Sequence, residues 1–156
     1  MIIKGENEMI NLAYKSGDQL AKSIEQNLVI YLSGDLGSGK TTFTKGLIRG
    51  LGFDGLVTSP TFSLVDRIET ELFLIWHIDL YRLERAEEII ELELHEEPNY
   101  KKPSIMIIEW PEKGHHLILP PDVEISFDTT KIKDERKIEL KDDTNKLGHA
   151  FNNWLE

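Results

Sequence analysis

The 156 residues are enough for a single domain spanning residues 1–156, and 40% hydrophobic with 29% charged residues is typical of a globular protein. No apolar run approaches the roughly 18 residues that cross a bilayer, no signal peptide opens the chain and cysteine is absent, so we expect a cytoplasmic protein without membrane contacts, disulfides or thiolate chemistry. The net charge of −10 disfavours strong direct binding of nucleic acid, because that affinity comes mainly from lysine and arginine.

The first predicted elements flank a glycine-rich turn. Residues 16–19 (SGDQ) predict a capping box that opens a short helix, with Ser16 as the N-cap. The continuous apolar run at residues 28–32 (LVIYL) predicts a strand buried on both faces, as in a parallel sheet. After the glycine-rich turn, residues 40–51 predict a helix that Gly52 ends.

The rest of the chain continues this mixture of strands and helices. Apolar or alternating segments predict five further strands: residues 62–68, 72–78, 105–108, 123–127 and 137–140. Two more helices are predicted, an acidic one over residues 86–97 that Pro98 ends and a terminal one over residues 145–155. This order predicts an α/β fold whose central sheet is mostly parallel, with some antiparallel strands.

The strongest functional signal is residues 34–41 (GDLGSGKT), which match the phosphate-binding pattern G-x-x-x-x-G-K-[ST]. Glycines let successive backbone N–H groups converge on an anion, and the following helix directs the positive end of its dipole to the same point. Lys40 would neutralise the outer phosphates, and the Thr41 hydroxyl would bind Mg²⁺. We therefore expect a P-loop NTPase-like three-layer fold with these ligand-binding residues: Asp35, Gly37, Ser38, Gly39, Lys40, Thr41 and Thr42.

ATP is the expected substrate and Mg²⁺ the expected cofactor. Guanine specificity usually needs an Asn-Lys-x-Asp element, and residues 145–148 (NKLG) lack the acid. A P-loop site also needs a carboxylate at the end of a neighbouring strand, and Asp79 and Glu109 each end a predicted strand. One of them would hold the metal, and the other would orient the attacking water or accept its proton. Lys40, Asp79 and Glu109 are thus the candidate catalytic residues.

A dense polar cluster, HIDLYR, surrounds Asp79. Strand alternation places His77, Asp79 and Tyr81 on the same side. His77 is either structural or catalytic, and Arg82 either stabilises charge on the γ-phosphate or pairs with the acidic helix that follows. Trp110 would pack either on the nucleotide side of the sheet or in the core.

A short loop, residues 59–62, follows the helix of the glycine turn and consists of Ser59, Pro60, Thr61 and Phe62. In P-loop switches a loop at this place senses the γ-phosphate and moves on hydrolysis. We interpret the segment as a switch-like loop, with a plain turn before a strand as the alternative.

Four blocks taken together resemble the bacterial TsaE (YjeE) family: GDLGSGKTTF, SPTFSLV, HIDLYRL and IIEWPE, in this order and spacing. The resemblance implies the ATPase component of the machinery that makes threonylcarbamoyladenosine in tRNA. It also implies two protein partners, TsaB and TsaD. In this family TsaD transfers the threonylcarbamoyl group to the tRNA, and TsaE uses ATP hydrolysis to reset the complex. The net charge of −10 is consistent with contact with these proteins rather than strong direct binding of tRNA.

The resemblance also implies roles for individual residues. Lys40 and Thr41 bind phosphate and Mg²⁺, Glu109 joins the magnesium site, and Asp79 is needed for hydrolysis. Residues 59–62 match the family's switch-like loop.

Two further positions bear on the nucleotide. Arg136 matches an arginine in the C-terminal strands that approaches it. The family often has a threonine shortly before the first helix, where this chain has Ala13, so no side-chain hydrogen bond to adenine is expected from this position.

Two other functions compete with an accessory ATPase. A P-loop small-molecule kinase should carry an arginine-rich lid, whereas this chain has five arginines without a cluster. A nucleotide-binding switch without meaningful turnover is the other alternative.

Overall fold

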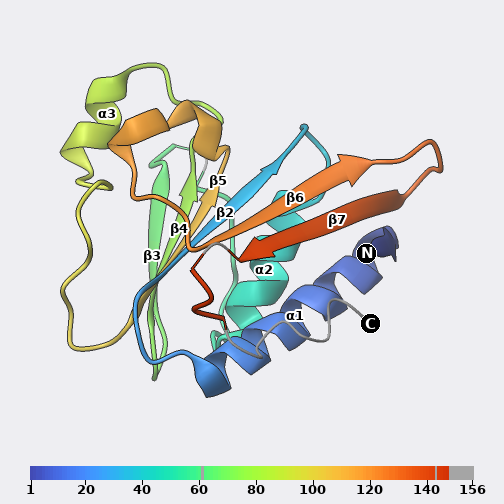
Figure 1. The fold of residues 1–156 in the computed structure, drawn as a ribbon, viewed down its shortest axis with the longest axis horizontal. Coiled ribbons are helices and arrows are strands. Elements are labelled where there is room, and N and C mark those ends of the chain that lie inside the picture. Colours follow the sequence, from blue (N-terminus) through green and yellow to red (C-terminus); the bar gives the residue numbers. More distant parts are fainter. Residues whose placement is uncertain (61, 143, 148–156) are drawn as a thin grey trace.

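A seven-stranded sheet forms the middle of the computed structural model, which describes residues 1–60, 62–142 and 144–147 (Figure 1). The strands are β1 (Ile2–Lys4), β2 (Leu28–Gly34), β3 (Val65–Glu69), β4 (Leu74–Asp79), β5 (Ser104–Glu109), β6 (Val123–Thr129) and β7 (Glu135–Asp142). The helices are α1 (Gly5–Ser23), α2 (Lys40–Gly50) and α3 (Ala86–Glu91), with 3₁₀ turns η1 (Pro111–Lys113) and η2 (His115–Leu117). None of these described helices is long and apolar enough to cross a membrane.

The sheet has the strand order β1-β7-β6-β2-β5-β4-β3. The four central strands are parallel, since β2 pairs in parallel with β5 and β6, and β4 with β5. The outer strands β3, β7 and β1 pair antiparallel with their neighbours. The predicted mixed α/β sheet is therefore confirmed, and its parallel strands end together at the edge of the sheet where a ligand crevice forms.

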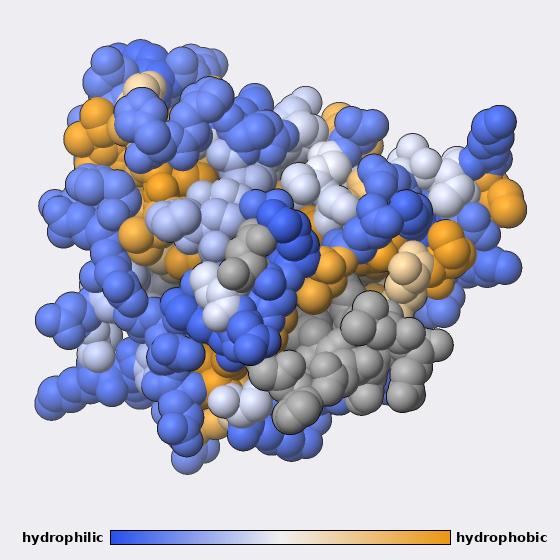
Figure 2. All heavy atoms as spheres, viewed as in Figure 1, coloured by the Kyte–Doolittle hydropathy of each residue, from blue (hydrophilic) through white to orange (hydrophobic). Residues whose placement is uncertain are grey.

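Helices and turns cover both faces of this sheet, which gives the three layers (Figure 1). Helices α1 and α2 pack on one face over a core that includes Leu32, Phe43 and Phe127, while α3 and the 3₁₀ turns lie over the other face around Trp76 and Ile89. Figure 2 shows that the outer surface on the viewed side is mostly hydrophilic, with small apolar areas between the charged side chains.

Helix α1 packs against α2 at very short distance because both helices carry glycine at the contact. A Cβ on Gly17 would lie 2.3 Å from the Leu47 carbonyl oxygen, and one on Gly50 would lie 2.2 Å from the Tyr14 carbonyl oxygen. The close approach fixes the direction of α2, and α2 begins at the glycine loop.

The predicted start of the first helix at Ser16 is wrong. Ser16 lies inside α1, buried, and its hydroxyl donates to the Leu12 carbonyl one turn earlier. The helix begins at Gly5, where the Glu8 carboxylate accepts the backbone N–H of Lys4. The sequence pattern that indicates this earlier start is the helical spacing of Met9, Ala13, Leu20 and Ile24, all of which are buried.

Two more predicted boundaries need correction. The strand expected over residues 62–68 begins only at Val65, because Leu64 adopts a left-handed backbone with φ of 61°. The acidic helix expected over residues 86–97 ends at Glu91, where like charges three and four residues apart disfavour continuation. Glu93, with φ of 53°, then redirects the chain and Leu94 is buried.

The strands predicted around residues 28–32 and 105–108 are confirmed as β2 and β5, and the helix after the glycine turn as α2. The strands predicted near residues 72–78, 123–127 and 137–140 are confirmed as β4, β6 and β7. The terminal helix predicted over residues 145–155 lies mostly outside the described residues.

The glycine contact between the two helices predicts a stability effect. Gly50→Ala should lower the free energy of unfolding by about 1 to 3 kcal/mol, because the new methyl group meets backbone atoms that cannot move aside locally. Urea denaturation measures this loss. Equal stability of Gly50→Ala and wild type would contradict the packing described.

Candidate nucleotide site

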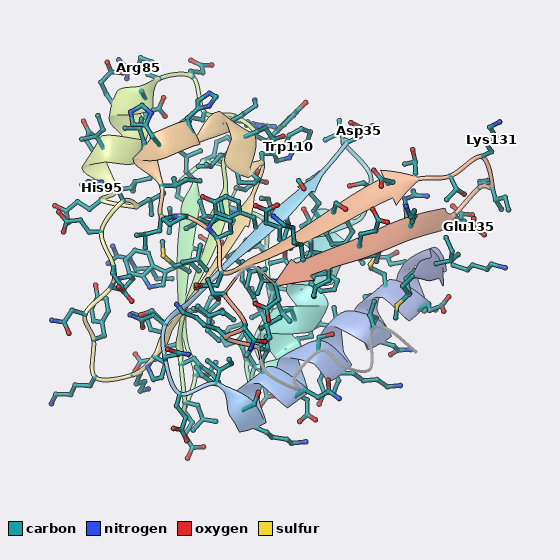
Figure 3. The ribbon with its side chains drawn as sticks, viewed as in Figure 1. Asp35, Arg85, His95, Trp110, Lys131 and Glu135 are labelled. Atoms are coloured by element: carbon teal, nitrogen blue, oxygen red, sulfur yellow. The ribbon has the colours of Figure 1, made fainter. Side chains whose placement is uncertain are left out.

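The glycine loop joins the end of β2 to the start of α2 at the carboxyl edge of the parallel strands. Gly34, Gly37 and Gly39 have φ of 145°, 77° and 106°, which side-chain-bearing residues rarely adopt. Gly39 is the N-cap of α2, so the free N–H groups of the first helical turn face the loop. Asp35 stands at the tip of this loop, at the same end of the sheet as Trp110 (Figure 3).

The Lys40 ammonium lies against the loop itself. Its Nζ donates to the carbonyl oxygens of Gly34 and Asp35, the latter at 2.9 Å, and lies 4.2 Å from the centroid of the Trp110 ring. Burial lowers the pKa of Lys40, while the nearby carboxylates, Glu109 foremost, oppose that shift. The site thus keeps a cation partly desolvated beside the loop, where it would interact strongly with an anion.

Glu109, at the end of β5, is 1% exposed and is surrounded by donors. Its Oε2 accepts from the Thr41 hydroxyl at 2.9 Å, and its Oε1 accepts from the Thr44 hydroxyl at 3.1 Å. His77 Nε2 lies 2.9 Å from the same Oε1. The structure therefore joins the glycine loop to the sheet through one carboxylate.

Asp79 ends β4 and is paired in register with Glu109 on β5. It is half-buried, and its Oδ1 accepts from the backbone N–H of Tyr81 at 3.0 Å. Burial raises the pKa of Asp79, with the charge of Glu109 adding to the shift, while the Tyr81 N–H, His77 and Lys40 oppose it.

These groups line a cavity of about 220 Å³ at the carboxyl ends of the strands. Its lining residues come from the loop, α2 and the ends of β4 and β5: Leu36, Gly37, Ser38, Gly39, Lys40, Thr41, Thr42, Asp79, Tyr81, Glu109 and Trp110. The predicted loop residues other than Asp35, both carboxylates, Tyr81 and Trp110 therefore converge on one cavity, which Asp35 does not line.

Aromatic side chains form one wall of this cavity. Trp110 has a left-handed backbone, with φ of 58°, and its ring lies 4.9 Å from that of Tyr81. Both interpretations of Trp110 are observed: its ring faces the glycine loop, and it also packs against the apolar core around Trp76 and Ile89. Arg82 does not line the cavity; its guanidinium lies 6.0 Å from the ring of Phe62.

The predicted switch-like loop precedes β3, and its described residues do not line the cavity. Pro60 is buried, Ser59 is half-buried, and Phe62 is 94% exposed. Thr61 lies outside the described residues. The Leu64 carbonyl that follows accepts the backbone N–H of Asp79 at 2.9 Å, so this segment is tied to the strand end that carries the carboxylate.

A second cavity of about 230 Å³ adjoins the other side of the glycine loop. Its lining residues are Gly5, Glu6, Met9, Gly37, Ser38, Gly39, Thr42, Asp134 and Arg136. Arg136 on β7 donates to the Gly37 carbonyl at 3.2 Å, so the arginine that the family resemblance implies near the nucleotide lies at the glycine loop.

The expectation that Ala13 precedes the first helix is wrong. Ala13 lies within α1, fully buried, and a Cβ on Gly46 of α2 would come within 2.8 Å of its own Cβ. Met9 and Glu6, one and two turns earlier, reach the second cavity together with Gly5 at the start of α1. Sequence reasoning missed them, and it missed Thr44, although a residue three positions after Thr41 on a helix shares its face.

The oxygen atoms present fit Mg²⁺. The Thr41 hydroxyl and the Glu109 carboxylate are hard oxygen donors, the kind of ligand that Mg²⁺ prefers. Mg²⁺ usually takes few ligands from the protein, and phosphates and waters complete its coordination shell. Among the described residues, no group of three or more His, Asp or Glu side chains could hold a metal without such additional ligands.

Comparison with known proteins shows the family. The family described as threonylcarbamoyl adenosine biosynthesis protein TsaE matches residues 5–138. The chain belongs to the TsaE family. A TsaE protein of Haemophilus influenzae is 38% identical over 144 residues, covering 92% of this chain and 89% of the relative, and one of Rickettsia felis is 38% identical over 138 residues, covering 88% and 75%.

A solved structure supports the fold. The crystal structure of Bacillus subtilis YdiB superimposes with a TM-score of 0.69 at 22% identity, covering 98% of this chain and 90% of that chain. The TsaE blocks recognised in the sequence therefore sit on the architecture shared with that protein.

The raised pKa of Asp79 predicts a pH-dependent cost to stability. The folded state disfavours the charged carboxylate, so the cost is present at pH above the raised pKa and disappears below the ordinary pKa of aspartate, about 3.9. Asp79→Asn should therefore unfold at higher urea concentration than wild type at pH 7. The difference should shrink as the pH falls towards 4.

Asp54→Asn, at an exposed loop position, is the control. An Asp79→Asn variant no more stable than wild type at pH 7 would contradict the environment assigned to this carboxylate.

Proposed function

We propose that the protein binds and slowly hydrolyses ATP with Mg²⁺, as an accessory subunit of the machinery that makes N6-threonylcarbamoyladenosine in tRNA. TsaB and TsaD are its proposed partners. The relatives are named as tRNA threonylcarbamoyladenosine biosynthesis proteins, which supports the pathway. The observation that carries the ATPase proposal is the convergence of Lys40, Thr41, Asp79 and Glu109 on one cavity beside a glycine loop.

The loop and α2 would hold the phosphates. Backbone N–H groups of the loop and of the first turn of α2 supply donors and the positive end of the helix dipole. Lys40 would exchange its bonds to loop carbonyls for stronger, charge-assisted bonds to phosphate oxygens. Thr41 and Glu109 would hold Mg²⁺, and the bound ion would offset the charge of the outer phosphates.

Asp79 would orient the attacking water and accept its proton. It ends the strand next to Glu109, faces the same cavity and is not a partner of Thr41 in the hydrogen bonds found. A carboxylate whose pKa is raised by burial is a stronger base than an exposed one. Tyr81 and Trp110 would restrict water from one side.

The adenosine part would lie in the second cavity. That cavity shares Gly37, Ser38 and Gly39 with the first, so one nucleotide could span both along the loop. Arg136 and Met9 line that cavity, where Arg136 would approach the nucleotide and Met9 would make apolar contact with the base.

The rim of the site would report the phosphate state to TsaB and TsaD. Leu36 is 71% exposed and Phe62 94% exposed, and Tyr81 is also exposed on the cavity wall. Apolar groups in these positions suit protein contact. The net charge of −10 supports a partner, rather than this chain, holding the tRNA, and the cytoplasm is the proposed location.

Replacing the loop lysine tests binding. Lys40→Ala should weaken ATP binding by at least tenfold, because each charge-assisted contact to a phosphate is worth about 1.5 to 3 kcal/mol. Isothermal titration calorimetry measures the affinity. Lys45→Ala, on the same helix but outside both cavities, is the matched control and should bind normally; normal affinity in Lys40→Ala would refute the site.

Turnover tests the proposed role. Phosphate release from ATP should be slow for the protein alone and faster with TsaB and TsaD, while Asp79→Asn should keep ATP binding and lose release. Phosphate transferred to an acceptor metabolite would instead indicate a kinase. Loss of ATP binding in Asp79→Asn would mean that the roles of Asp79 and Glu109 must be exchanged.

A further inference from the structure

The two carboxylate oxygens of Glu109 are held differently. Oε2 accepts from Thr41, the hydroxyl assigned to Mg²⁺, at 2.9 Å. Oε1 accepts from Thr44 at 3.1 Å and lies 2.9 Å from His77 Nε2. Oε2 is therefore the oxygen on the metal side, and Oε1 is the oxygen anchored to the protein.

Thr44 is an incomplete anchor for Oε1. Its hydroxyl lies 3.0 Å from the Lys40 carbonyl oxygen and 3.1 Å from Glu109 Oε1, both within donating distance. A hydroxyl has one proton, so a bond to one acceptor weakens the bond to the other. Oε1 consequently depends chiefly on His77.

The surroundings of His77 favour donation from Nε2. It is fully buried, and its Nδ1 has no partner among the described residues. With the proton on Nε2, the ring donates to Glu109 and leaves only a lone pair unpaired; with the proton on Nδ1, a buried N–H would lack an acceptor. A donor held at this distance orients the carboxylate.

The sheet fixes the distance between His77 and Glu109. On the paired strands β4 and β5, His77 is in register with Ile107, and Asp79 is in register with Glu109. His77 therefore lies two residues before Asp79 on the same face of β4, further from the carboxyl edge of the sheet. It does not line the cavity.

We propose that His77 is a positioning residue for the magnesium site: its Nε2–H fixes Oε1 of Glu109 so that Oε2 faces the cation beside Thr41. The proposal rests on the proposed function, because it concerns the same nucleotide site. Hydrogen-bond partners behind a metal ligand commonly change metal affinity by about 10- to 100-fold when removed.

The test compares His77→Leu, which removes the donor, with His77→Gln, which keeps an N–H donor on a side chain of similar reach. Binding of a non-hydrolysable ATP analogue is measured by calorimetry in EDTA and over a range of Mg²⁺ concentrations. His77→Leu should need about 10- to 100-fold more Mg²⁺ for half of the magnesium-dependent gain in affinity, with unchanged affinity in EDTA. His77→Gln should recover most of the loss, and His95→Leu, at an exposed site, should match wild type.

An unchanged Mg²⁺ requirement in His77→Leu would overturn the proposal. Equal losses of affinity with and without Mg²⁺ would indicate a merely structural role and would also overturn it. If His77→Leu does not fold, His77→Phe removes the donor with a ring of comparable shape; failure of both to fold beside a stable His77→Gln would again mark a structural role. Wild-type protein that gains no affinity from Mg²⁺ would instead refute the proposed function itself.

Discussion

The buried charge of Glu109 is the constraint on which the site depends. A carboxylate that is 1% exposed is tolerated in a protein interior only when donors replace the water it has lost. Those donors come from α2, through Thr41 and Thr44, and from β4, through His77. Satisfying one side chain therefore fixes the glycine loop and its helix relative to two central strands.

Other features of the fold keep this arrangement in register. Gly17 on α1 and Gly50 on α2 let the two helices approach until backbone atoms touch, and this contact with α1 sets the direction of α2. On the sheet side, parallel pairing brings Asp79 and Glu109 to the same edge. The cost is visible at Asp79, whose pKa is raised because burial disfavours its charge. A half-desolvated carboxylate is useful for proton transfer and unfavourable for stability, as expected where function and folding compete.

Much of this site could be predicted from sequence because its signals are local. The glycine spacing, the apolar runs of β2 and β5, and the acids that follow β4 and β5 are contiguous patterns, and all of them met at one cavity. The start of α1 was missed because Ser16 mimics an N-cap, whereas the helical spacing from Met9 onward extends further back. The role of Ala13 was misjudged for the same reason. The second cavity depends on contacts between elements distant in the sequence, which composition and spacing do not encode, whereas Thr44 could have been found from its helical spacing to Thr41.

The central claim is that Glu109 and Thr41 form a magnesium site for a nucleotide on the glycine loop. Glu109→Gln tests it most directly, because the amide keeps the size of the side chain and removes only its charge. Affinity for a non-hydrolysable ATP analogue should be measured in EDTA and in Mg²⁺ for this variant and for wild type. We expect Glu109→Gln to bind the analogue in EDTA at least as well as wild type and to lose the gain that Mg²⁺ provides. The same Mg²⁺-dependent gain in both proteins would contradict the account.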